Sequence, residues 1–348
     1  MRKLFFILLL SVSIIRILTV INREYEDKNV RVSGYLYEDP KAYTTNVLIK
    51  LKGYRMFLPR DERLTYGAWI SVVGTVKGQE LQKAKLLTAA PPTSPIAKAR
   101  MNILSVLRSS IPEPQSSLVS GMAIGANAIP LQFDALLKST GTSHVVVASG
   151  GNVAILAGFL EAVLSRFIRR KFFIIVNLFM LTVYACLVGL GAPIVRALFM
   201  WSAVSLSQLT GRVVSQSFIL LIVVLGMLIV WPFWILDVSF WLSVGATSGI
   251  MLLNKRIIKR LRPIPIGREA LATSLSAQIG ILPISFFVFH EVNLLSPLWN
   301  TAVLWTVPYI TILGMMGGVF SLVIPPIGKI FFVAAYPFAL WFTSVISL

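Results

Sequence analysis

Apolar runs of membrane-spanning length recur along most of this chain and constrain its fold more than any other feature. About 20 apolar residues in a helix rise far enough to cross the ~30 Å hydrocarbon core of a bilayer. The chain of 348 residues is 56% hydrophobic and only 13% charged, and residues 4–21 form the first such run. This composition excludes a soluble globular fold. We predict a polytopic α-helical membrane protein of about nine spans.

The basic residues between the apolar runs predict the orientation of the spans. After the first run, we expect spans at 142–165, 172–190, 192–210, 213–231, 233–253, 270–290, 295–323 and 329–348. Basic residues cluster at 166–171 and at 255–268. Cytoplasmic loops carry an excess of Lys and Arg, so both clusters should be cytoplasmic. Alternating crossings of the plasma (inner) membrane then place the N-terminus in the cytoplasm and residues 28–92 outside.

Residues 1–27 are interpreted as an uncleaved N-terminal anchor, because no small-x-small cleavage site follows the run. Residues 28–92 differ from the rest of the chain, since apolar residues alternate with polar or small ones, as at Val47, Ile49 and Leu51. Alternation at period two predicts strands. About five short strands in this length favour an extracytoplasmic, all-β, OB-like domain.

Two segments follow the β domain before the main group of spans. Residues 93–115 contain Lys98, Arg100 and Arg108 among apolar residues, a pattern typical of an amphipathic linker helix lying along the interface. Residues 116–348 form the predicted transmembrane domain. Its first stretch, 116–138, is moderately apolar and rich in small residues, and whether it spans, re-enters or lies at the interface stays open.

Polar side chains inside the predicted spans carry the functional signal, because an Arg or Asp at mid-membrane costs about 2.5–3.5 kcal/mol. Arg196, Asp237 and His144 all fall in the outer third of the bilayer in the predicted topology. We expect Arg196 and Asp237 to face the bundle interior and to line or brace an outer vestibule. The alternative is that Arg196 snorkels to the headgroups while Asp237 pairs with backbone at a helix start.

A run of poor helix formers interrupts one span. Ser149, Gly150, Gly151 and Asn152 are consecutive in the 142–165 span, and each Gly costs a helix roughly 1 kcal/mol relative to Ala. Broken backbone at membrane depth is tolerated where it is buried in protein or lines a water-filled cavity; close helix packing through small residues is the alternative. The candidates for pore-lining residues are His144, Ser149, Gly150, Gly151, Asn152, Arg196, Asp237, Gln278 and Asn300.

Signatures of catalysis and of metal binding are missing from the sequence. Cys186 is the single cysteine, so neither an internal disulfide nor a thiolate cluster can form. Gly328-Lys329 lacks the rest of a P-loop, and no H-E-x-x-H or G-x-S-x-G motif is present. We therefore predict no metal, no cofactor and no enzymatic activity.

Four ordered strings over about 116–348 resemble the ComEC-type competence family, the inner-membrane channels of natural transformation. The strings are Gly141-Thr142-Ser143-His144 with Ser149-Gly150-Gly151-Asn152-Val153; Pro193 with Arg196-Ala197 and Gly211-Arg212; Asp237 with Phe240, Leu242-Ser243 and Ala246; and Gln278 with Pro283, Ser296-Pro297 and Asn300. Tyr66-Gly67 with Val72 and Gly74 also resembles the family's OB-like domain. The resemblance implies a channel that passes single-stranded DNA to the cytoplasm.

The OB-like domain fits a role in DNA contact, since basic groups take phosphates and aromatic faces stack bases. Its DNA-contact candidates are Lys50, Lys52, Tyr54, Arg55, Arg60 and Arg63. The alternative is that the aromatic residues form the core of the domain. Besides single-stranded DNA and the lipid bilayer, the resemblance implies a cytoplasmic ATPase or single-stranded-DNA-binding protein and a separate surface receptor or nuclease as partners; a homo-oligomer stays open.

The chain departs from the family pattern at several positions. Asn152 stands where the family usually has a second His, and Gly125-Ala126-Asn127 lacks the charged residue often found after that Gly. We also expect a short form without the metallo-β-lactamase-like domain of many relatives. Two other functions stay open: a small-molecule permease, which uses similar broken helices, and a membrane-embedded hydrolase built on His144, Ser149 and Asp237.

Overall fold

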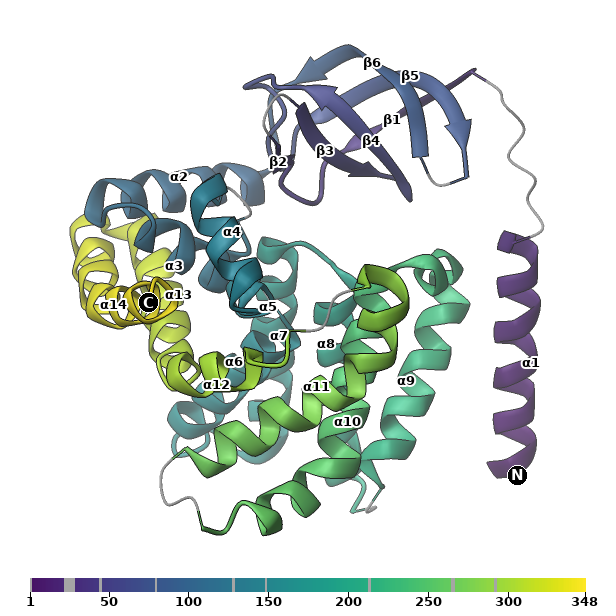
Figure 1. The fold of residues 1–348 in the computed structure, drawn as a ribbon, viewed down its shortest axis with the longest axis vertical. Coiled ribbons are helices and arrows are strands. Elements are labelled where there is room, and N and C mark those ends of the chain that lie inside the picture. The colour runs from purple at the N-terminus through teal and green to yellow at the C-terminus, as the bar shows by residue number, and fades with distance from the viewer. Residues whose placement is uncertain are drawn as a thin grey trace.

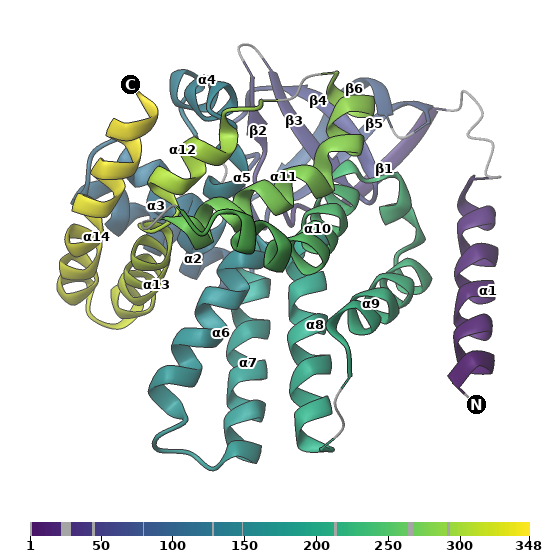
Figure 2. The same cartoon turned by 60° about the horizontal axis from the view of Figure 1, so that its bottom comes forward.

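The structure is a computed structural model that combines a small β module with a larger helical part (Figure 1). It describes residues 2–21, 29–43, 46–78, 80–126, 129–147, 149–211, 214–263, 267–290 and 293–348. Asn127 and Arg212, which belong to two of the sequence motifs, lie outside these described residues. The N-terminal end of α1 (Arg2–Ile21) lies at the end of the molecule away from the β module (Figures 1 and 2).

The β module is a six-stranded sheet in the order β1-β5-β6-β4-β3-β2. Its strands are β1 (Asn29–Tyr35), β2 (Lys41–Ala42), β3 (Asn46–Leu51), β4 (Tyr54–Pro59), β5 (Trp69–Lys77) and β6 (Glu80–Ala90). All neighbours are antiparallel except β4 and β6, which pair in parallel. The alternation read from the sequence is confirmed at Val47, Ile49 and Leu51, whose side chains are buried in the module's core.

The helical part follows from residue 95 onwards. Its elements are α2 (Pro95–Ser110), α3 (Gln115–Ile124), α4 (Leu131–Ser139), α5 (Ser143–Val146), α6 (Gly150–Leu164), α7 (Arg170–Val188), α8 (Ala192–Leu209), α9 (Gln216–Val230), the 3-10 helix η1 (Pro232–Leu236), α10 (Val238–Arg260), α11 (Arg268–Phe289), α12 (Ser296–Val303), α13 (Val307–Val323) and α14 (Pro325–Ile346). α13 packs against α2, α3, α6 and α14. The helix predicted in 93–115 therefore buries its apolar face on α13 and α14.

Several predicted spans are broken in the structure. The 142–165 span is divided into α5 and α6, and the 233–253 span begins as η1 and continues as α10. The predicted 295–323 span is the pair α12 and α13, bent by 53°. Residues 116–138 contain the two short helices α3 and α4. A chain breaks its helices where side chains or neighbouring helices can satisfy the freed backbone groups.

Three helices in the described part of the chain are long and apolar enough to cross a bilayer: α7, α11 and α14. The bent pair α12 and α13 makes a fourth if it counts as one span, and α6 and α9 are apolar but shorter. The predicted anchor helix, α1, packs along α9. Ser13 Oγ donates to the Leu225 carbonyl at 3.3 Å, and Arg16 Nε donates to the Ile229 carbonyl at 3.3 Å.

Glycines let α10 and α11 approach each other closely. A Cβ atom added to Gly249 would lie 2.2 Å from the Ser276 carbonyl oxygen, and one added to Gly280 would lie 2.2 Å from the Gly245 carbonyl oxygen. Both distances are far below van der Waals contact, so any side chain at these positions forces the two backbones apart. Small residues at such crossings are the usual basis of close packing between membrane helices.

We predict that Gly249→Ala lowers the free energy of unfolding by about 1–3 kcal/mol, the usual cost of overpacking. Thermal unfolding of the purified protein in detergent measures this. The matched control is Gly226→Ala in α9, where an added Cβ meets no atom within 4 Å. Equal stability of the two variants would contradict the close-packing account.

Candidate functional site

Two of the four sequence motifs meet around the buried side chain of Arg196, and Thr247, the residue that follows the third motif, contacts it as well. Arg196 lies on α8 with 7% of its surface exposed, and its Nη1 donates to Thr247 Oγ1 on α10. A Cβ atom added to Gly150, the first residue of α6, would lie 3.0 Å from Arg196 Nη2. Arg196 Nε is buried and has no hydrogen-bond partner among the described residues. We refer to Gly150, Arg196 and Thr247 as the arginine cluster.

The start of α6 places Gly150 against this arginine. Ser149 is the N-cap of α6, and its Oγ accepts a hydrogen bond from the Gly151 backbone N–H at 3.2 Å. Asn152 follows one turn into the helix and is 1% exposed. Its Nδ2 donates to the Met122 carbonyl at 2.9 Å, which ties α6 to α3. The consecutive glycines thus serve a helix start and a close approach to a guanidinium.

A second polar cluster joins the first motif to the fourth. Ser296 Oγ donates to the Gly141 carbonyl at 3.3 Å, and Asn300 Nδ2 donates to Ser296 Oγ and to Ser274 Oγ, each at 3.2 Å. His144 is exposed, and its Nδ1 lies 3.0 Å from the same Gly141 carbonyl. Asn300 Oδ1 is buried without a partner among the described residues. We call Gly141, Ser274, Ser296 and Asn300 the amide cluster.

Gln278 lies beside this cluster. Its Nε2 donates to the Asn293 carbonyl at 3.2 Å, and Asn293 Nδ2 in turn donates to the Ser139 carbonyl. Gly141 has a φ of 70°, and a Cβ there would lie 2.7 Å from Ser296. Only glycine meets both conditions without strain. The fourth motif is therefore held against the turn that precedes α5.

Asp237 and Arg196, which we expected to brace one vestibule, have different partners. Asp237 is the N-cap of α10, and its Oδ1 accepts from the Ser239 backbone N–H at 2.9 Å. The same oxygen lies 4.0 Å from Arg55 of the β module. Asp237 therefore pairs with backbone at a helix start, as the alternative interpretation expected, and it also approaches a cation of the β module. His144, Ser149 and Asp237 each have separate partners, so their contacts do not form a hydrolase triad.

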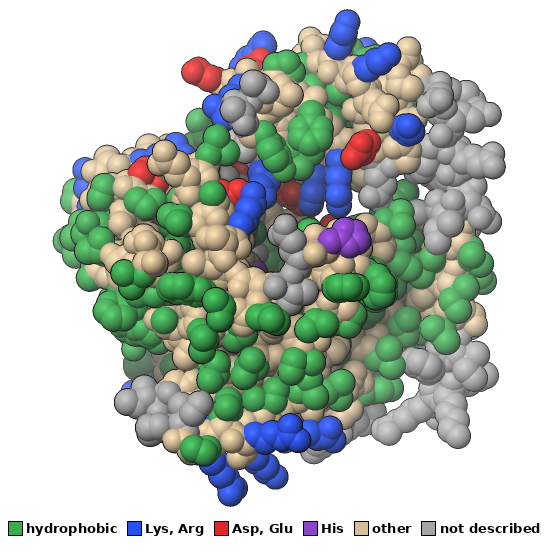
Figure 3. Space-filling model, in the orientation of Figure 1, with side chains coloured by type: hydrophobic (Ala, Val, Ile, Leu, Met, Phe, Trp, Pro, Cys, Tyr) green, Lys and Arg blue, Asp and Glu red, His purple; other side chains and the backbone are tan. Residues whose placement is uncertain are grey.

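A groove lies between the β module and η1, and three predicted DNA-contact residues line it. Its volume is about 640 Å³, within the range of ligand sites, ~300–1,000 Å³. Figure 3 shows Lys and Arg side chains gathered where the β module faces the helical part. The residues lining the groove are Ser33, Gly34, Tyr35, Tyr37, Glu38, Lys50, Leu51, Lys52, Gly53, Arg55, Trp69, Trp231, Phe233, Trp234 and Asp237.

The other three DNA-contact candidates lie outside this lining. Tyr54 is half-buried and packs against the module's core. Arg60 Nη2 donates to the Tyr43 carbonyl at 2.6 Å. Arg63 forms an ion pair with Asp61 at 2.7 Å, and its hydrogen bonds lower the pKa of the Asp61 carboxyl to about 2. Asp61 therefore stays charged beside Arg63 at any physiological pH and opposes an incoming phosphate there.

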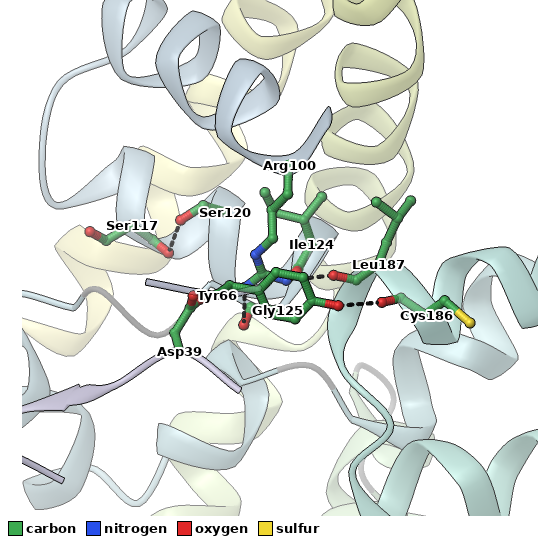
Figure 4. A network of polar contacts seen from close by, with 9 residues as sticks. All are labelled: Asp39, Tyr66, Arg100, Ser117, Ser120, Ile124, Gly125, Cys186 and Leu187. Carbon is green, nitrogen blue, oxygen red and sulfur yellow. Dashed lines mark hydrogen bonds and ion pairs between the residues drawn. The ribbon is translucent and has the colours of Figure 1, made fainter. Parts of the chain in front are cut away.

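Sequence reasoning missed the role of Arg100, a buried cation with several bonds to backbone carbonyls (Figure 4). It lies on α2 with 1% of its surface exposed. Its Nη1 donates to the carbonyls of Ile124 at 2.6 Å and Leu187 at 2.5 Å. Its Nη2 donates to the Gly125 carbonyl at 3.1 Å and pairs with the Asp39 carboxylate. The guanidinium thus satisfies carbonyls at the C-terminal ends of α3 and α7, where helix dipoles favour a cation.

Tyr66 of the β module completes this contact. The Arg100 guanidinium carbon lies 4.4 Å from the centroid of the Tyr66 ring, a distance suited to a cation–π interaction. The Tyr66 hydroxyl donates to the Cys186 carbonyl at 2.7 Å. Burial raises the pKa of Tyr66, so the phenol keeps the proton that this bond requires. Arg100, Asp39 and Tyr66 form what we call the domain joint.

One signal in the sequence points to Arg100. The buried residues of α2 are Ala97, Arg100, Ile103 and Leu107. This spacing of three, three and four is that of one helix face. Arg100 therefore falls on the apolar face of an amphipathic helix, whereas Lys98 and Arg108 fall on the polar face. A cation on an apolar face requires buried acceptors.

We predict that Arg100→Met destabilises the protein by about 3–5 kcal/mol, because it removes the charged donor that bonds to the Asp39 carboxylate and to the helix-end carbonyls. Thermal unfolding and limited proteolysis between the β module and α2 measure the effect. Arg108→Met, at an exposed position on the same helix, is the matched control. The double variant Arg100→Met/Asp39→Asn should recover part of the loss. An Arg100→Met protein as stable as the control would refute the joint.

Comparison with known proteins places the chain in a family. The family model described as "Competence protein" matches residues 122–348. The chain is 27% identical over 256 residues to ComE operon protein 3 of Bacillus subtilis (strain 168). The aligned region covers 72% of this chain and 32% of the relative. It is 23% identical over 232 residues to the uncharacterized protein YcaI of Escherichia coli (strain K12). That aligned region covers 63% of this chain and 31% of the relative.

The chain spans about a third of the length of these curated relatives, and no solved structure matches it. The family match begins within α3, continues through α14 and contains both the arginine cluster and the amide cluster. The first and second motifs meet in one cluster, and the first and fourth meet in the other. By the extent of the match, this chain belongs to the competence protein family.

Proposed function

We propose that this protein is a channel component for the uptake of single-stranded DNA in natural transformation. The observation that carries the proposal is a buried cation, Arg196, at the point where two of the sequence motifs meet. A charged side chain inside a membrane bundle is costly and typically marks a pathway for an ion or substrate. A guanidinium is also well suited to phosphate, the group that every nucleotide presents.

Unpartnered polar atoms in the helical part support a hydrated interior. Arg196 Nε, Asn177 Oδ1 and Asn300 Oδ1 are buried and lack hydrogen-bond partners among the described residues. An unsatisfied buried polar atom costs about 1–3 kcal/mol. Water in a conduit would satisfy these atoms. A wet interior is what a translocated, charged strand requires.

The proposed fold is a bundle of nine spans with an external OB-like module. The order of the five longer strands and the parallel pairing of β4 with β6 agree with a Greek-key barrel of this type. Besides the three long apolar helices, we assign the remaining crossings to α1, α6, α8, α9, α10 and the bent pair α12 and α13. The short helices α3 and α4 would then re-enter or lie at the interface.

The proposed orientation puts the β module outside the plasma membrane and the N-terminus in the cytoplasm. The N-terminus and the α6–α7 connection lie away from the β module (Figure 2). The exposed residues Arg166, Arg169 and Lys171 lie in or beside that connection. Cytoplasmic loops are enriched in such residues, so the charge distribution supports this orientation.

The proposal assigns no enzymatic activity to this protein. The energy for translocation and the processing of the DNA strand would then come from partner proteins. We propose a cytoplasmic ATPase or single-stranded-DNA-binding protein that pulls the strand, and a surface receptor or nuclease that delivers it. Assembly as a homo-oligomer is part of the same hypothesis. The absence of a P-loop from the sequence motivates the separate ATPase.

We predict that Arg196→Met reduces transformation to the level of a deletion strain while DNA binding at the cell surface and the amount of membrane-inserted protein stay normal. The change keeps the side-chain length and removes the charge and its donors. Counting transformants and measuring cell-bound labelled DNA separate uptake from binding.

Arg166→Met is the control, because Arg166 is exposed between α6 and α7 and several other cations remain nearby. It should transform normally. Normal transformation by Arg196→Met would show that Arg196 has no role in DNA uptake. Normal transformation by a clean deletion would overturn the proposed function as a whole.

A further inference from the structure

The groove between the β module and η1 is lined by cations and by aromatic rings. Lys50, Lys52 and Arg55 come from the β3–β4 hairpin, whereas Trp231, Phe233 and Trp234 come from the helical part. The β module also contributes aromatic side chains, so rings line the groove from both parts. The groove therefore exists only while the two parts stay docked.

The geometry of η1 presents its indole rings together. In a 3-10 helix, residues i and i+3 lie on the same face, and the Trp234 backbone N–H donates to the Trp231 carbonyl at 3.1 Å. The two rings have centroids 4.6 Å apart and planes tilted by 31°. The Trp231 side chain is large and apolar, yet 40% of its surface is exposed. Exposed flat rings are the feature on which nucleic-acid bases stack.

The cations of the groove lie on the β3–β4 hairpin, and two of them form weak ion pairs with carboxylates. Lys52 and Gly53 both have positive φ, 50° and 88°, so they form the tight turn of the hairpin and project Lys52 into solvent. Lys50 lies 3.6 Å from Glu38, and Arg55 lies 4.0 Å from Asp237. Both pairs are partly exposed. Such pairs are worth only about 0.2–1 kcal/mol, so a phosphate can replace either carboxylate.

We propose that single-stranded DNA binds across this groove, with its phosphates on Lys50, Lys52 and Arg55 and its bases on Trp231 and Trp234. Asp237 and Glu38 occupy the cations in the empty state and are displaced when the strand enters. This inference rests on the proposed function and specifies where the strand is first held. A bound strand then touches both parts of the protein at once.

The lining favours a nucleic acid over an anionic phospholipid, which also presents a phosphate. A lipid needs an aliphatic trough for its acyl chains. The apolar surface of the groove is instead almost wholly aromatic, and its one aliphatic side chain larger than alanine, Leu51, is only 3% exposed. Ring faces opposite cations match alternating bases and phosphates.

The test measures binding of a fluorescently labelled oligothymidine to the full chain in nanodiscs of neutral lipid. The double variant Trp231→Ala/Trp234→Ala should bind the oligonucleotide about 5- to 150-fold more weakly. This range corresponds to the loss of one stacked base. Trp231→Phe keeps a ring face and should retain most of the affinity. Trp305→Ala removes a similarly exposed tryptophan, 49%, that packs with Tyr309 and Trp341, and it should bind like the wild type.

A second variant separates displacement from mere packing. Asp237→Asn keeps the N-cap of α10, since Asn caps as well as Asp, but frees Arg55. Binding should tighten about two- to fivefold, the equivalent of a surface ion pair. If the Arg55–Asp237 pair serves only to dock the β module, binding should weaken instead. With three cations engaged, the logarithm of the binding constant should fall against the logarithm of salt concentration with a slope of about −2.

The outcomes distinguish this inference from the proposed function. If the wild type binds DNA and the Trp231/Trp234 variant binds equally well, the strand is held elsewhere and only the groove assignment fails. If the wild type binds no DNA and deletion leaves transformation normal, the proposed function fails. If vesicles of phosphatidylglycerol displace the DNA completely and bind with the same dependence on Trp231 and Trp234, the groove is a lipid site and the inference is overturned.

Discussion

The arrangement of the molecule depends on how one buried guanidinium finds its acceptors. Arg100 lies in a dehydrated position where a charge without partners costs several kcal/mol. Its donors meet the carbonyl ends of α3 and α7 and the Asp39 carboxylate. These acceptors come from sequence positions far from one another, so the bonds form only when the β module, α2, α3 and α7 are all in place. The cost of leaving Arg100 unpaired therefore favours a single docking geometry.

The same docking geometry determines the shape of the groove. The Tyr37 carbonyl oxygen lies 2.7 Å from the position of a Cβ on Gly189, which has a φ of 102°. A side chain there would lift the β module from the end of α7. With the domain joint close by, this contact holds one edge of the module firmly. At Arg55 and Asp237, the printed contact between the described parts is a 4.0 Å ion pair, which is weaker than the domain joint, and this part of the boundary lines the groove.

Features that depend on local periodicity could be predicted from the sequence, and features that depend on tertiary pairing could not. The strands around Val47 and the helix α7 follow from period two and from apolar length. The bend between α12 and α13 was missed because the apolar length of 295–323 outweighed Pro308, which stands at the first turn of α13 and marks the helix start. The groove was missed because Trp231 and Trp234 resemble an interfacial aromatic belt in the sequence. Their role appears only when η1 faces the β3–β4 hairpin.

Two of the sites that the proposed function assigns to DNA hold cations of different chemical kinds. Arg196 is buried with a neutral hydroxyl as its partner, so a phosphate reaching it meets no competing carboxylate among its described contacts. Lys50 and Arg55 are partly exposed and are already paired with carboxylates. The free energy of binding a phosphate there is therefore reduced by the free energy of breaking the existing ion pair. In the proposed function, weak and exchangeable binding at the groove and an uncompensated cation at Arg196 would produce a gradient of affinity toward the interior. A strand must be able to leave its first site, and carboxylates that return to the vacated cations would assist that release.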